Sequence, residues 1–162
     1  MSAWATWLTW LEDSPPGLAM RQSPWLYPVV EITHILGFVI LVGAVVMFDL
    51  RLLGLSRKIP VAALAEHLLP WAHLSFALVA LSGVMLFASD ARAIGVSPVF
   101  YLKLALIAAA GFNAAAFHIW FLKSVPAWEQ NTTPPPVVRA IAVFSVVLWV
   151  AVIACGRLIA YF

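Results

Sequence analysis

The chain has 162 residues, of which 64% are hydrophobic and only 10% are charged, and its mean hydropathy is +1.01. Because a soluble domain carries about 25% charged residues, this composition excludes an ordinary soluble domain and predicts an integral membrane protein. The net charge of +2 comes from scattered Lys and Arg without a basic run, which argues against a nucleic-acid partner. The single cysteine, Cys155, excludes an intrachain disulfide and a cysteine-based metal cluster.

Residues 1–27 are predicted to form an N-terminal interfacial segment. Large apolar side chains recur there with helical spacing, at Trp4, Trp7, Leu8 and Leu11, as in an amphipathic helix that lies on a membrane surface. The Pro15-Pro16-Gly17 sequence is predicted to end this helix. No basic stretch precedes it and Glu12-Asp13 follows, so a cleavable signal peptide is not expected.

Four later segments are long and apolar enough to cross a bilayer, which takes about 20 residues in a helix. A proline marks the start of each, where the first helical turn tolerates it. Short connections make consecutive helices antiparallel neighbours. Residues 28–162 are therefore predicted to form an all-α, up-down four-helix membrane bundle, with spans at about 28–50, 71–89, 99–122 and 137–160 and a separate short helix at Val61–Leu68.

The basic residues predict an orientation, because they favour the cytoplasmic side of a membrane. The first and third loops and their flanks carry five, namely Arg51, Arg57, Lys58, Lys123 and Arg139. The other side carries three, Arg21, Arg92 and Arg157. We therefore expect both termini to lie outside the cytoplasm.

Three histidines, His34, His73 and His118, fall inside the predicted spans. An ionisable group there is costly and marks a functional site by default, and imidazole is a common ligand of metals and haem iron. At a rise of about 1.5 Å per residue, counting from the span ends places His73 and His118 together near the inner face. The same count places His34 in the outer half, with Lys103 at a similar depth.

Both inner histidines continue into faces of small residues, Ala77 and Ala80 after His73, and Ala110 and Ala114 before His118. Such faces leave room for a flat macrocycle, but they also let bare helices pack closely. Lys103 is open to three interpretations: pairing with a haem propionate, pairing with Glu31, or reaching to the interface. Asp49 and Arg51 are predicted to form a structural pair or a topology anchor.

Several strings carry a family resemblance, namely Glu31-Ile32-Thr33-His34-Ile35-Leu36-Gly37, Asp49-Leu50-Arg51-Leu52-Leu53-Gly54, Ser82-Gly83, Phe100 with Lys103, and Asn113 with Phe117-His118. Over residues 23–122 the chain resembles a poorly characterised family of small bacterial four-helix membrane proteins. It is more distantly similar to copper-resistance membrane proteins, the membrane-type protoporphyrinogen oxidase and small b-type cytochromes. The family resemblance implies a bacterial inner membrane, so the termini, placed outside by the basic residues, are expected in the periplasm. The more distant relatives imply haem b or copper held by intramembrane His. The family's recurring positions map to His34, Lys103 and His118, whereas His73 has no counterpart.

The leading hypothesis is a membrane b-type cytochrome with His73 and His118 as axial ligands of one haem b. A second, outer site would use His34, with Lys103 or Met85 nearby. The protein would be an electron-transfer protein rather than a stand-alone enzyme, although the distant relatives leave a porphyrin-modifying enzyme open. Expected partners are the lipid bilayer, a quinol or periplasmic redox protein, and a larger membrane complex or a homo-oligomer. The alternatives are copper handling or transport, and a non-catalytic subunit of a larger complex.

Overall fold

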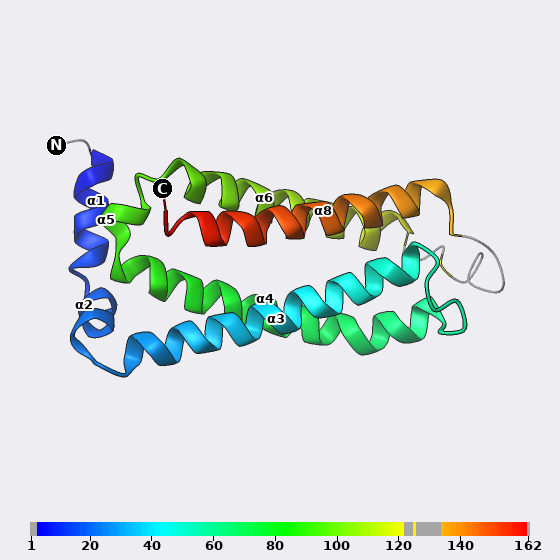
Figure 1. The fold of residues 1–162 in the computed structure, drawn as a ribbon, viewed down its shortest axis with the longest axis horizontal. Coiled ribbons are helices and arrows are strands. Elements are labelled where there is room, and N and C mark those ends of the chain that lie inside the picture. The colour runs from blue at the N-terminus through cyan, green and yellow to red at the C-terminus, as the bar shows by residue number, and fades with distance from the viewer. Residues whose placement is uncertain (1–2, 122–124, 126–133, 162) are drawn as a thin grey trace.

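The computed structural model describes residues 3–121, 125 and 134–161, which are helical apart from short connections and contain no strand. The four long helices lie side by side, and short helices lie across one end (Figure 1). In chain order the elements are α1 (Ala3–Glu12), α2 (Pro15–Gln22), α3 (Leu26–Leu52), α4 (Val61–Ser89), α5 (Ala91–Ile94), α6 (Pro98–Ala116), the π-helix η1 (Phe117–Phe121) and α8 (Pro136–Leu158).

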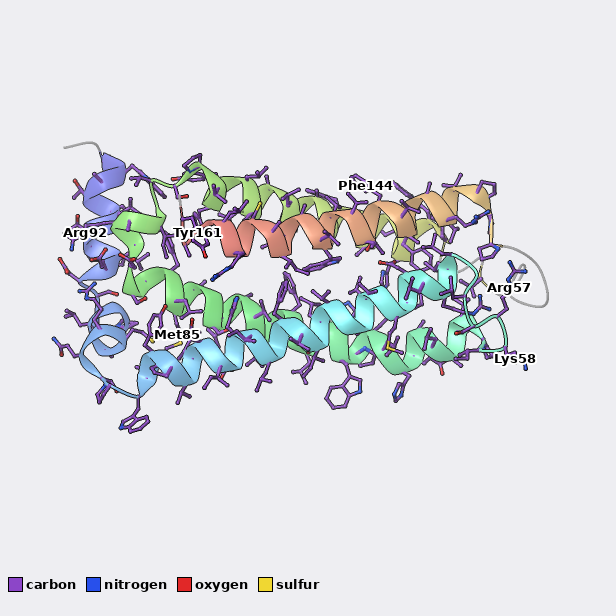
Figure 2. All side chains as sticks on the ribbon, in the orientation of Figure 1. Arg57, Lys58, Met85, Arg92, Phe144 and Tyr161 are labelled. Carbon is purple, nitrogen blue, oxygen red and sulfur yellow. The ribbon has the colours of Figure 1, made fainter. Side chains whose placement is uncertain are left out.

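The long helices confirm the predicted all-α, four-span, up-down architecture. The helices α3, α4, α6 with η1, and α8 hold 27, 29, 24 and 23 residues, each long and apolar enough to cross a bilayer. Both termini lie at one end of the bundle, called here the terminal end (Figure 1). Charged side chains gather at the two ends, with Arg92 at the terminal end and Arg57 and Lys58 at the opposite end (Figure 2).

The bundle consists of two helical hairpins that meet where α3 packs on α8. Helix α3 packs along α4, α6 packs along α8, and α3 also packs on α8, whereas α4 and α6 make very few direct contacts. Two apolar clusters fill the interior. One, called here the far cluster, lies at the far end, opposite the terminal end, and includes Phe48, Leu52 and Phe117. The other lies nearer the middle and includes Leu41, Leu148 and Trp149.

Two predicted features at prolines need correction. The N-terminal helix α1 ends at Glu12, before Pro15 and Pro16 as predicted, but the two prolines also begin a second helix, α2, because a first helical turn has no N–H bond for proline to lose. Pro70 lies inside α4, so the predicted short helix at Val61–Leu68 is continuous with the second span. An interior proline costs about 3 kcal/mol, and burial of Val61 and Ala65 in the far cluster helps to offset this cost.

The N-terminal helices are fastened to the loop between α4 and α6. Glu12, whose side chain is only 7% exposed, forms ion pairs with Arg92 at 2.7 Å and with Arg21 at 3.2 Å. The hydrogen bond from Arg92 lowers the pKa of the Glu12 carboxyl. Trp4 adds a bond from its indole Nε1 to the Gly95 carbonyl oxygen at 3.2 Å. These contacts hold α1 and α2 against the terminal end.

Candidate functional site

His73 of α4 and His118 of η1 lie next to each other, as depth counting predicted. Their ring centroids are 6.0 Å apart and the ring planes meet at 67°. The uninterrupted α4 places His73 two residues from the helix midpoint rather than near its start. Two imidazoles from different helices therefore face one space between the two hairpins.

Hydrogen bonding fixes the tautomer of His118. Its Nδ1 lies 2.9 Å from the Ala114 carbonyl oxygen, which can only accept, so Nδ1 carries the proton and donates. The remaining nitrogen, Nε2, then has a free lone pair. Nε2 is buried and has no hydrogen-bond partner among the described residues. A buried acceptor without a partner is unfavourable, and it is the arrangement found in metal-bound histidines.

The π-helical turn η1 presents His118 to α4. Phe117 is buried in the far cluster and packs edge-on against Phe48 at 5.5 Å, which anchors the turn on α3. The next residue, His118, lies beside His73 of α4. Single π turns within α-helices occur frequently at functional sites. The sequence has no signal that would have predicted this turn.

The helices α4 and α6 make very few direct contacts, and the boundary between them is called here the open seam. Phe87 stacks on Phe100 at 4.9 Å with planes 4° apart, and His73 meets His118. Both contacts come from one face of α4, whose intervening residues are exposed, namely Ala77, Ala80 and Val84. On the facing side Gly111 and Ala114 are exposed, and a Cβ added at Gly111 would meet nothing within 4 Å. The small residues therefore do not serve close packing of α4 on α6.

Beside the two histidines lies a groove of about 510 Å³, lined by residues that include Glu66, Pro70, His73 and His118. This volume falls within the range of ligand pockets, about 300–1,000 Å³. Among the described residues no three His, Cys, Asp or Glu side chains converge on one metal position. Haem needs only one or two axial ligands from the protein, so the residues present fit a haem better than a bare ion.

His34, in contrast, joins two helices. Its Nδ1 lies 3.0 Å from the Oγ of Ser82 on α4, and Ser82 in turn donates to the Leu78 carbonyl oxygen at 2.7 Å. Because the single hydroxyl proton is used there, the His34 ring donates to Ser82. The ring also lies against Gly83, where a Cβ would come within 3.2 Å of its Cε1. His34 therefore makes an interhelical bond between α3 and α4, away from the His73–His118 pair.

Lys103 lies close enough to His34 for the two to interact electrostatically. Its Nζ is 3.9 Å from the position that a Cβ at Gly156 would occupy, so it points toward α8. The structure describes both Lys103 and Glu31, and these two residues form no ion pair with each other. The contacts described here thus hold His34 against Ser82 and turn Lys103 toward α8, and they include neither a bond between His34 and Lys103 nor the carboxylate partner considered for Lys103.

Asp49 and Arg51 do not form the predicted pair. The Arg51 Nε donates to the Ile59 carbonyl oxygen at 2.6 Å, which turns Arg51 toward the connection to α4. Asp49 is 5% exposed, is hydrogen-bonded to Ser145 of α8, and has no partner for Oδ2 within the described parts of the chain. Sequence reasoning missed this site because a nearby Arg offered a simpler partner. The signal available was an Asp in one span with Ser145 and Asn113 at matching depth in two others.

Comparison with known proteins adds one assignment. No curated protein and no solved structure matches the chain. Residues 8–162 match the model of a family of unknown function, DUF6644. Because this match covers almost the whole chain, the protein is a member of that family.

Proposed function

We propose that this protein is a membrane b-type cytochrome, in which His73 and His118 hold one haem b and the protein passes electrons within the membrane. The observation that carries the proposal is the buried, unpartnered Nε2 of His118 beside His73. A haem iron ligated by two histidines has no open position, which suits electron transfer rather than oxygen chemistry. When bound, haem b would supply a one-electron carrier that no side chain provides.

The residues around the pair have definite tasks in this proposal. The Ala114 carbonyl holds the Nδ1–H of His118, which keeps Nε2 available and makes the ring a stronger ligand. Phe117 fixes the turn that carries His118. The small residues Ala77, Gly111 and Ala114 of α4 and α6 are exposed, and a flat ring held by the two histidines would lie against them.

The deciding experiment is a reduced-minus-oxidised absorption spectrum of the protein purified after expression with ample haem. We expect a b-type spectrum that is lost in His73→Ala and in His118→Ala. His67→Ala is the matched control, since His67 is an exposed histidine on the same helix α4, and it should keep the spectrum. A wild-type protein without a Soret band, or both variants with an unchanged spectrum, would contradict the proposal.

Metal analysis by mass spectrometry separates haem from copper, the second candidate. We expect iron at about one atom per chain and copper at background. A protein that shows no haem spectrum, but whose copper content is lost in His73→Ala and His118→Ala, would instead favour copper handling.

We also infer that the protein resides in the bacterial inner membrane with both termini in the periplasm. The excess of basic residues at the far end supports this orientation. Alkaline phosphatase fused to the C-terminus is expected to be active, because that enzyme works only outside the cytoplasm. Activity only when it is fused within the loop between α3 and α4 would reverse the orientation. A quinol or a periplasmic redox protein is the partner that this function requires.

A further inference from the structure

A second polar site lies inside the bundle, on the interior side of His118. It is a cavity of about 60 Å³ between α3, α4, α6, η1 and α8. Asp49, Asn113 and Ser145 bring polar groups to walls that are otherwise mostly apolar. Asp49 is more than nine-tenths buried, and its Oδ2 has no hydrogen-bond partner among the described residues. A carboxylate in such surroundings is costly unless something neutralises it.

The polar groups of this cavity have already used hydrogen-bond donors on the protein itself. Ser145 is hydrogen-bonded to the Asp49 carboxylate, which can only accept. Asn113 donates an amide N–H to the Ile141 carbonyl oxygen at 3.2 Å. Asn113 keeps a second amide N–H, but the buried group left without a partner is the acceptor Oδ2 of Asp49, so the guest that matches it brings positive charge.

Among the residues that the structure describes, no basic side chain lines the cavity to supply that charge. Arg51, two residues along α3, is bonded to the Ile59 carbonyl oxygen. From α4 the lining residues are Leu68, Leu69 and Ala72, and α6 and α8 contribute no ionisable group. His118 is the other titratable group on the lining, and its proton is held by Ala114. The single negative charge thus calls for a single positive one, because a divalent ion would leave an excess charge in an apolar interior.

The size of the cavity agrees with a small ion and its water. One buried water molecule needs about 10–15 Å³ of cavity, so 60 Å³ holds a small ion and a few water molecules. Carboxylate, hydroxyl and amide oxygens are the ligands that hard cations prefer. We propose that Asp49, Ser145 and Asn113 form an intramembrane site for a small monovalent cation, bound as Na⁺ or as a proton carried on water. This proposal leaves His118 Nε2 to haem and does not rest on the proposed function.

Labelling with the hydrophobic reagent dicyclohexylcarbodiimide tests the site in the wild-type protein, so no variant has to fold. The reagent reacts with protonated carboxyl groups, and mass spectrometry locates the adduct. We expect labelling of Asp49 at neutral pH and none of the exposed Glu66. If the guest is Na⁺, labelling becomes about tenfold slower when Na⁺ replaces choline at about ten times its Kd. If the guest is a proton, Na⁺ has no effect and the rate falls as the pH is raised.

Thermal unfolding in detergent covers the case in which the reagent does not reach Asp49. Na⁺, or a lower pH, is expected to raise the unfolding temperature of the wild type but not of Asp49→Asn. Ser145→Ala should weaken the effect. Ser75→Ala, which removes another buried serine that does not line the cavity, should leave it unchanged. The proposal is overturned if neither cation alters labelling or unfolding, or if Asp49→Asn keeps the wild-type response.

Discussion

The Arg92 side chain donates to Oε1 of Glu12 at 2.7 Å, and the Arg92 backbone N–H donates to Oε2 at 2.9 Å. This two-point contact joins residues 80 positions apart in the chain, so it forms only when α1 is folded against the start of α5. The carboxylate is thereby held in its ionised form, which makes the docking of the N-terminal helices sensitive to acid.

The Glu12 contact predicts a specific acid dependence of stability. Hydrogen bonding by Arg92 lowers the pKa of Glu12 in the folded protein. The stabilisation is therefore complete above the ordinary glutamate pKa of about 4.3 and is lost as the pH falls through the lower folded-state pKa. We expect Glu12→Gln to unfold about 2–4 °C below the wild type at neutral pH, with the difference vanishing in acid. Parallel melting curves at all pH values would contradict this account.

Two glycines form a matched pair for testing close approach. At Gly17 an added Cβ would lie 2.8 Å from the Ala88 carbonyl oxygen and closer still to that of Glu12, both rigid backbone atoms. Gly17→Ala should therefore cost about 1–3 kcal/mol in the free energy of unfolding. At Gly43 no atom lies within 4 Å, so Gly43→Ala should be neutral or stabilise by up to about 1 kcal/mol. Denaturant unfolding in micelles measures both, and equal effects would contradict the packing at Gly17.

Filling the open seam should displace the haem without removing a ligand. Ala77 is exposed on the face of α4 that points toward α6. We expect Ala77→Leu to lower the haem content of the purified protein at least about fivefold, since larger side chains in a fitted space cost about 1–3 kcal/mol. Ala63→Leu, at another exposed alanine of α4, should keep the haem. Full haem content in Ala77→Leu would place the macrocycle elsewhere.

His34 should matter for stability rather than for the inner haem. Its bond to Ser82 joins α3 to α4, and such interhelical bonds are worth about 0.6 kcal/mol on average and up to about 1.7. A double-mutant cycle of His34→Ala and Ser82→Ala should give a coupling energy in that range. The His34→Ala variant should keep the b-type spectrum. A spectrum lost in His34→Ala but retained in His73→Ala would show that the wrong pair was assigned.

Much of the fold could be predicted from the sequence because the bilayer imposes long apolar helices. Length and apolarity were sufficient for the four spans, and counting residues along antiparallel neighbours brought His73 and His118 together. Proline was the ambiguous signal, because Pro15 and Pro70 can begin, end or interrupt a helix, and only tertiary packing decides among these.

The candidate sites were harder to predict, because their partners come from distant segments. Asp49 has Arg51 two positions away, yet its hydrogen-bond partner is Ser145, on a different helix. The partner of His34, Ser82, is 48 positions away. The π turn begins at Phe117, whose ring packs against Phe48 of α3, a contact that no local pattern records.

The helices α4 and α6 make very few direct contacts along their length, while α1 and α2 lie across the terminal end of the bundle (Figure 1). A molecule bound between these helices would thus arrive through the plane of the bilayer and not from water. The amount of this molecule that dissolves in the lipid would limit how often the site is occupied, whatever the affinity of the two histidines for it. Solubility in the membrane would therefore be the first criterion by which this protein selects what it binds.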